Sequence, residues 1–171
     1  MNATQLIQQF LQWMYSPEAV QSDTLEGIFA RIIVAEIITA VLAYLLRKYR
    51  PGDTIQQLPE DVVTLMMEGR YGLAYLLLTA YTLFEEALFF GAPIWLLRQL
   101  SLAEHEATAE YIASQLWALL HIHPGIAIPL IPMAVLKATL WLTGYWWIST
   151  LWHIAHNTLA YLTLLLSLIH I

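Results

Sequence analysis

The chain has 171 residues, of which 59% are hydrophobic and only 12% are charged. A soluble domain carries about 25% charged residues, so the composition excludes an ordinary water-soluble core and predicts one integral-membrane domain over residues 1–171. The absence of cysteine excludes disulfides and thiolate chemistry. A net charge of −6 with only seven Lys and Arg disfavours nucleic acid as a partner.

The first part of the chain predicts a surface helix followed by a membrane span. Residues 1–22 are predicted to form an interfacial helix and linker, because the first stretch is uncharged and carries apolar side chains at helical spacing. Residues 24–48 predict the first span, which ends in the basic cluster of Arg47, Lys48 and Arg50. Basic residues favour the cytoplasmic side of a membrane, so we expect this end to lie inside the cell.

The remainder predicts a polar loop and four further spans. Residues 51–69 are the most polar stretch and predict a loop with one helical turn. Gly91-Ala92-Pro93 is expected to kink the span that contains it. The fold class is therefore all-α: a polytopic membrane helix bundle of about five transmembrane segments, with its N-terminus outside a plasma or inner membrane. The four later spans are predicted at 71–97, 108–122, 126–143 and 145–169.

Two adjacent carboxylates, Glu85 and Glu86, lie in the middle of a long uncharged run. An ionisable side chain at that depth is costly and marks a functional-site hypothesis. Counting from the segment ends at 1.5 Å per residue places His121, His153 and Asn157 within roughly 8 Å of the depth of Glu85. These three side chains are therefore candidate partners of the two acids.

The candidate partners occur in two pairs with a spacing of four residues. Trp117-x-x-x-His121 places an aromatic ring and an imidazole on one helical face, and His153-x-x-x-Asn157 does the same for an imidazole and an amide. A carboxylate and an imidazole together can activate a water molecule. An imidazole and an amide can stabilise a developing oxyanion. The set has the parts of an intramembrane hydrolase that needs neither serine nor cysteine.

The order Glu-Glu, aromatic-x-x-x-His and His-x-x-x-Asn resembles the CAAX protease and bacteriocin-processing (CPBP) family of glutamate-type intramembrane endopeptidases, which includes the Ras-converting CAAX endopeptidases. The resemblance covers about residues 71–165 and implies that 71–169 is a catalytic core. It implies that the bilayer and a membrane-anchored or prenylated peptide are the partners. The implied roles are water activation by Glu85 and His121, support by Glu86, and oxyanion stabilisation by His153 and Asn157.

Two positions depart from the family pattern. The family's first motif usually reads Glu-Glu-x-x-x-Arg, but Phe90 occupies the Arg position here, and Trp117 replaces the usual Phe of the second motif. Without that Arg, Glu86 needs another counter-ion. Arg31 and Lys137 are the basic residues deep in other predicted segments, so each is a candidate supporting cation.

Several alternatives remain open at this point. No cofactor is expected, but Glu85, His121 and His153 would be the ligands if a divalent metal such as zinc were bound. The leading functional hypothesis is an intramembrane endopeptidase. The alternative is a catalytically degenerate scaffold or assembly subunit with other membrane proteins as partners, and a third, weaker hypothesis is a proton-relay transporter.

The other polar and aromatic residues have ordinary structural interpretations. Glu36 is expected to pair with Arg31 or Lys137. Two other imidazoles in the later segments, His123 and His156, are interpreted as bystanders, and His170 is interpreted as a frayed terminal residue. A group of tryptophans near segment ends is interpreted as an interfacial aromatic belt: Trp141, Trp146, Trp147 and Trp152.

Overall fold

The computed structural model describes residues 2–49, 58–121 and 124–169, and it is helical with no strand in those ranges. The prediction of an all-α chain is confirmed. Some residues named in the sequence predictions lie outside these ranges: Arg50 and the first part of the polar loop, His123, and His170. The elements are α1 (Ala3–Tyr15), α2 (Pro17–Gln21), α3 (Leu25–Tyr49), α4 (Glu60–Met67), α5 (Tyr71–Glu85), η1 (Glu86–Gly91), α6 (Ala92–Gln99), η2 (Ala103–His105), α7 (Glu106–Leu120), α8 (Pro124–Leu142) and α9 (Trp146–Ile169).

Local sequence signals account for where the first helices begin and end. Asn2 caps α1 through a capping box with Gln5. Ser16 then ends α1 and caps α2, with Pro17 at the first helical position, where its missing N–H costs nothing. The predicted polar loop contains more helix than expected, because α4 runs for eight residues.

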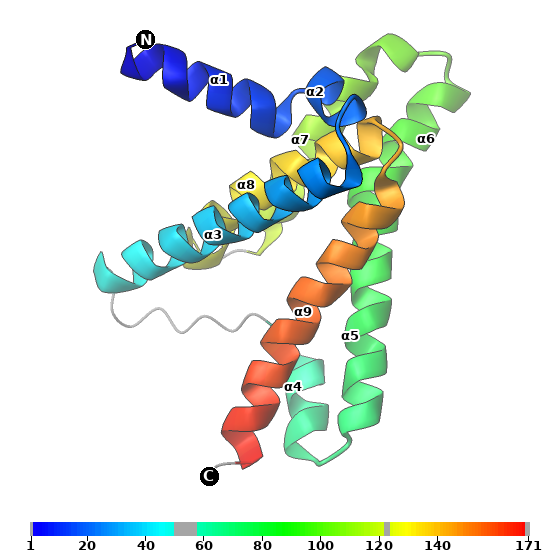
Figure 1. Cartoon of the computed structure of the whole chain (residues 1–171). Coiled ribbons are helices and arrows are strands. Elements are labelled where there is room, and N and C mark those ends of the chain that lie inside the picture. The colour runs from blue at the N-terminus through cyan, green and yellow to red at the C-terminus, as the bar shows by residue number, and fades with distance from the viewer. Residues whose placement is uncertain (1, 50–57, 122–123, 170–171) are drawn as a thin grey trace.

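The helices pack as two groups (Figure 1). α3, α7 and α8 pack together, while α4 and α9 pack on α5. α1 projects away from the bundle at one end (Figure 1). Each group has its own apolar core, one including Met133 and Leu136 and the other including Val62 and Leu78. The functional site described below lies where these two cores meet.

Helices α5, η1 and α6 form one continuous helical rod with a π-helical centre. The π-helix begins at Glu86 and ends at Gly91, where the sequence predicted a kink. Ala92 donates its backbone N–H five residues back, to the carbonyl of Ala87, and Pro93 has no N–H to continue the regular pattern. The proline therefore converts one turn of the rod to π-helix.

Two helices of the described chain are long and apolar enough to cross a bilayer. They are Leu25–Leu46 and the rod Tyr71–Gln99, and Ala127–Leu142 is apolar but shorter. Large apolar side chains face outward along the first of these, including Phe29, Ile33 and Ile37. The described part of the chain thus has two candidate membrane-spanning helices.

Candidate functional site

A cavity of about 280 Å³ lies between α5, η1, α7, α9 and the residues that directly precede α4. It brings together four of the predicted site residues, Glu85, His121, His153 and Asn157, with Trp117 beside them. Glu86 does not line the cavity. The remaining lining residues are mostly apolar: Leu58, Pro59, Leu78, Tyr81, Phe89 and Leu120.

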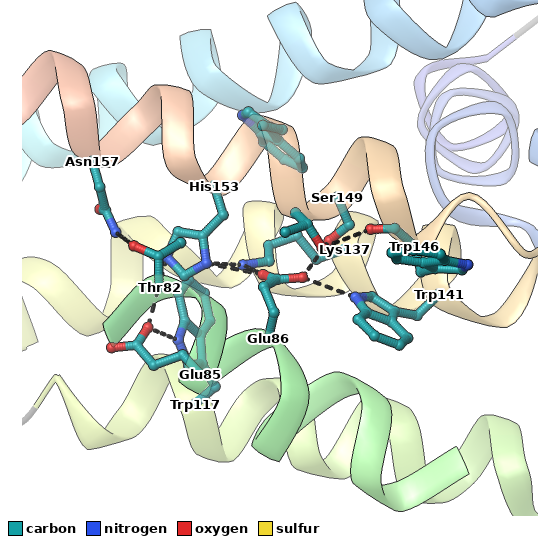
Figure 2. Close-up of polar contacts among 12 residues, drawn as sticks. Thr82, Glu85, Glu86, Trp117, Lys137, Trp141, Trp146, Ser149, His153 and Asn157 are labelled. Carbon is teal, nitrogen blue, oxygen red and sulfur yellow. Dashed lines mark hydrogen bonds and ion pairs between the residues drawn. The ribbon is translucent and has the colours of Figure 1, made fainter. Parts of the chain in front are cut away.

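Glu85 and Glu86 point to different surroundings because they lie at the junction of α5 and η1. Glu85 is the last residue of α5, and Glu86 is the first of the π-helix. Consecutive helical residues diverge by about 100° around the axis. One carboxylate therefore reaches the cavity between α7 and α9, while the other is directed toward α8 and the first turns of α9 (Figure 2). Short π-helical segments are frequent at functional sites.

Glu86 is buried and its two oxygens are fully occupied. Oε1 forms an ion pair with the ammonium of Lys137 and lies 2.9 Å from Nδ1 of His153. Oε2 accepts hydrogen bonds from the indole N–H of Trp141 at 2.9 Å and the hydroxyl of Ser149 at 3.0 Å (Figure 2). Glu86 has no oxygen left for a substrate, so it acts as a structural anchor.

Lys137 supplies the counter-charge of Glu86 from α8. Its side chain is 0% exposed, and its Nζ lies 4.5 Å from the ring centroid of Phe90 and 4.3 Å from that of Trp117. An ammonium over an aromatic face is attracted by the ring quadrupole. The rings of Phe90 and Trp117 therefore hold the cation that neutralises Glu86.

Arg31, the other candidate cation, does not reach Glu86. It donates to Asp23 through Nε and Nη2, and its guanidinium lies 4.9 Å from the ring centroid of Trp13. Asp23 precedes α3 and lies two helical turns before Arg31, so a local partner is available. Arg31 ties α1 and α3 together and is not part of the site.

Glu85 is the carboxylate that remains free in the cavity. Its side chain is 30% exposed, and its one protein hydrogen bond among the described residues comes from the indole N–H of Trp117 to Oε2, at 2.7 Å. The Nε2 atom of His153 lies 3.6 Å from the same oxygen. Glu85 is thus oriented by one donor, and its Oε1 accepts no hydrogen bond from the described residues.

The imidazole of His121 is oriented by its own helix. Its Nδ1–H donates to the backbone carbonyl of Trp117 at 2.9 Å. In the neutral ring this leaves Nε2 as an acceptor in the cavity. Asn157 of α9 is oriented by α5. Its Nδ2 donates to the hydroxyl of Thr82 at 2.9 Å, and that hydroxyl donates to the carbonyl of Leu78.

The tautomer of His153 depends on two competing contacts of Nδ1. That nitrogen lies 2.7 Å from Nζ of Lys137 and 2.9 Å from Oε1 of Glu86. A neutral ring satisfies one contact or the other. If Nδ1 accepts from Lys137, Nε2 carries the proton and is a donor toward the cavity; if Nδ1 donates to Glu86, Nε2 is an acceptor.

Glu36 forms a second carboxylate–imidazole pair outside this cavity. It accepts from the indole N–H of Trp152 at 2.6 Å and from Nδ1 of His156 at 3.0 Å. The expectation that it pairs with Arg31 or Lys137 was wrong, because those cations have nearer acids. His156 lies outside the cavity, as expected, and its contact with Glu36 joins α3 to α9.

Sequence reasoning missed Trp141 and Ser149 as partners of Glu86. The spacing of four residues could have identified both, because Trp141 follows Lys137 by four residues, Ser149 precedes His153 by four, and such pairs share a helix face. Trp141 was instead assigned to an aromatic belt. Trp146 is exposed, as a belt residue would be, whereas Trp141 donates inward.

The three ligands of the zinc alternative, Glu85, His121 and His153, all line the cavity. Within the described part of the chain, no group of three or more His, Asp or Glu side chains is arranged to hold an ion. Oε2 of Glu85 already accepts from Trp117, and Nδ1 of His153 faces Lys137 and Glu86. The zinc alternative therefore stays a prediction.

Comparison of the chain with protein-family models, with curated proteins and with solved structures finds no match.

Proposed function

We propose that this protein is an intramembrane endopeptidase that hydrolyses a peptide bond through water activated by Glu85. The observation that carries the proposal is that the two adjacent acids have different surroundings. Glu86 is neutralised and fully hydrogen-bonded, whereas Glu85 is oriented by Trp117 and faces a cavity that also contains His121 and His153. In a purely structural pair of acids, both carboxylates would be neutralised or fully hydrogen-bonded, whereas here one remains accessible beside two imidazoles. The resemblance of the three motifs to the CPBP family supports the same function.

The architecture that suits this function is a five-span bundle with α1 lying on the membrane surface. The two candidate spans support it, together with the exposed apolar residues of α9 such as Leu159 and Leu166. α9 has 24 residues and is therefore about 36 Å long. In this arrangement the N-terminus lies outside, and the substrate is a membrane-anchored or prenylated peptide.

In the proposed reaction, a water molecule lies between Glu85 and Nε2 of His121. Glu85 takes a proton as the water oxygen attacks the carbonyl carbon of the peptide. The resulting oxyanion accepts from the free N–H of the Asn157 amide and from Nε2–H of His153. The C–N bond then breaks, and the proton held by Glu85 passes to the leaving amine, so that one water is consumed and the carboxylate is regenerated.

This scheme requires one particular tautomer of His153. Its Nδ1 must accept from Lys137 so that Nε2 carries the hydrogen that faces the oxyanion. The 2.7 Å contact between Nζ and Nδ1 supports that assignment. Lys137 thereby has two roles, as counter-ion of Glu86 and as the donor that orients His153.

The alternative function is a catalytically degenerate scaffold or assembly subunit of a membrane complex. The observation that favours it is Phe90, which replaces the charged residue of the family motif and leaves a neutral, closed cluster around Glu86. In that case the cavity around Glu85 has no catalytic role, and the exposed apolar faces of the helices bind partner subunits.

Cleavage in labelled water separates the two functions. The full-length protein is reconstituted in liposomes with membrane-anchored test peptides, among them a prenylated C-terminal peptide, a bacteriocin-type leader and a C-terminal sorting anchor. A peptidase incorporates one ¹⁸O atom from water into each new carboxyl terminus, as measured by mass spectrometry. The scaffold yields no new termini from any member of the panel.

A further inference from the structure

A second cavity, of about 570 Å³, lies at the end of the rod near α6 and the turn between α8 and α9. Its α6 wall includes Trp95 and Arg98, and its other wall includes Trp141 and Trp146. No residue lines both this cavity and the first one. The remaining lining residues are Gly91, Ile94, Gln99, Leu142, Thr143 and Gly144.

The position of this cavity matches the interface between a bilayer and water. It opens at the Gln99 end of the candidate span Tyr71–Gln99. Trp95 is 62% exposed and Trp146 is 53% exposed, and exposed tryptophans concentrate at the level of lipid headgroups. The natural ligand at this depth is therefore part of a lipid.

Arg98 provides a site for a phosphate group. Its Nε and Nη2 donate to the two oxygens of Glu106 at 2.9 and 3.0 Å, which leaves Nη1 unused. A guanidinium with a free donor binds a phosphate oxygen through a charge-assisted hydrogen bond. Because Glu106 balances the charge of Arg98, the site as a whole has no excess positive charge to favour a purely anionic headgroup.

The tryptophans provide a complementary site for a cation. The ring centroids of Trp141 and Trp146 lie 6.1 Å apart with planes inclined at 41°, and Figure 2 shows the two side chains together near the α8–α9 turn. Aromatic faces arranged around a cavity bind alkylammonium groups. The carboxylate of Glu106 beside the cavity favours the same positive group.

We propose that this cavity binds the headgroup of a zwitterionic phospholipid. The phosphodiester lies against Nη1 of Arg98, and the ammonium lies against the faces of Trp141 and Trp146. Trp141 lines the cavity and also donates to Glu86. A lipid bound here therefore contacts an indole that anchors the candidate catalytic site.

The test measures lipid binding to the delipidated full-length protein in detergent by native mass spectrometry. Three lipids with identical acyl chains are compared: a phosphatidylcholine, a phosphatidylglycerol, and a diacyl trimethylammonium lipid without phosphate. The phosphatidylcholine is expected to bind five- to tenfold more tightly than either of the others. Equal binding of the three lipids overturns the proposal.

Variants at the two ends of the rod show whether the contact is specific. Arg98→Gln is expected to weaken phosphatidylcholine binding about tenfold. Arg70→Gln is the matched control, because Arg70 is also exposed and ion-paired at the opposite end of the rod, with Glu68, and it should change nothing. Equal effects of the two variants would contradict the assignment of Arg98.

A third variant separates direct binding from loss of structure. Glu106→Gln breaks the same surface ion pair as Arg98→Gln but leaves the guanidinium uncompensated. Phosphatidylglycerol should then bind at least fivefold more tightly than it does to the wild type. If Glu106→Gln instead weakens all lipids as Arg98→Gln does, the ion pair only maintains the local fold and the proposal is wrong.

Discussion

Replacing Lys137 by Met tests whether the buried cation holds the site together. The variant keeps most of the apolar stem and removes the ammonium that pairs with Glu86 between the rings of Phe90 and Trp117. Removing one partner of a buried ion pair costs about 3–5 kcal/mol. Two donors still reach the other oxygen of Glu86, so we expect a loss near the lower end, about 3 kcal/mol.

The loss is measured as the free energy of unfolding in mixed dodecylmaltoside and SDS micelles, followed by helical circular dichroism. Met133→Leu is the control on the same helix, since Met133 is also fully buried and a volume-conserving swap costs less than about 1.5 kcal/mol. Adding Phe90→Arg to Lys137→Met places a cation one turn after Glu86 and should recover about half of the loss. The reasoning is refuted if Lys137→Met is as stable as Met133→Leu, or if the double variant is no more stable than the single one.

Three further changes are predicted from single contacts. Trp117→Phe keeps an aromatic ring but removes the indole N–H that donates to Glu85. Peptide cleavage should then slow about tenfold, which corresponds to a loss of about 1.4 kcal/mol of transition-state stabilisation. An unchanged rate in the liposome assay would show that this hydrogen bond does not contribute to cleavage. Gly91→Ala would place a Cβ 3.1 Å from the indole ring of Trp141 and should destabilise the protein by about 1–2 kcal/mol. Gly72→Ala is the control, because nothing lies within 4 Å of its added Cβ, and it should not destabilise the protein. Thermal unfolding of the two variants compares them. The hydrogen bond from Arg31 holds the pKa of Asp23 below its usual value, so its stabilisation is complete above about pH 4 and is lost as the pH falls through the lowered pKa. Asp23→Asn should therefore cost about 2 kcal/mol at pH 7 and progressively less as the pH falls through that lowered pKa, and a pH-independent difference in unfolding free energy would contradict the ion pair.

The sequence predicts the helices well because the signals for helix ends are local. Pro17 and Gly144 mark breaks that the structure also has, and long apolar runs between such breaks have few alternatives to helix. The spacing of four residues also indicates which side chains share a face. Depth along the spans and the order of the motifs group Glu85 with His121, and the structure places both on one cavity.

Depth along a span does not determine direction around the helix, and this accounts for the errors. Arg31 and Lys137 lie at suitable depths for Glu86, but only Lys137 faces it, because Asp23 binds Arg31 locally. The same limitation affected Trp141, whose position near a helix end is compatible with facing either lipid or the interior. The π-helix was also beyond sequence reasoning, since Pro93 predicts a disturbed turn without specifying its form.

The central claim is that Glu85 is the group that activates water, and cleavage by paired glutamine variants tests it most directly. Glu36 is the matched control, because it too is a partly exposed carboxylate held by an indole and an imidazole, but it lies outside the cavity. Initial rates are measured in liposomes on whichever peptide of the panel the wild type cleaves. We predict that Glu85→Gln abolishes cleavage while remaining folded, and that Glu36→Gln retains at least a third of the wild-type rate. Full activity in Glu85→Gln, or an equal loss in both variants, would contradict the account.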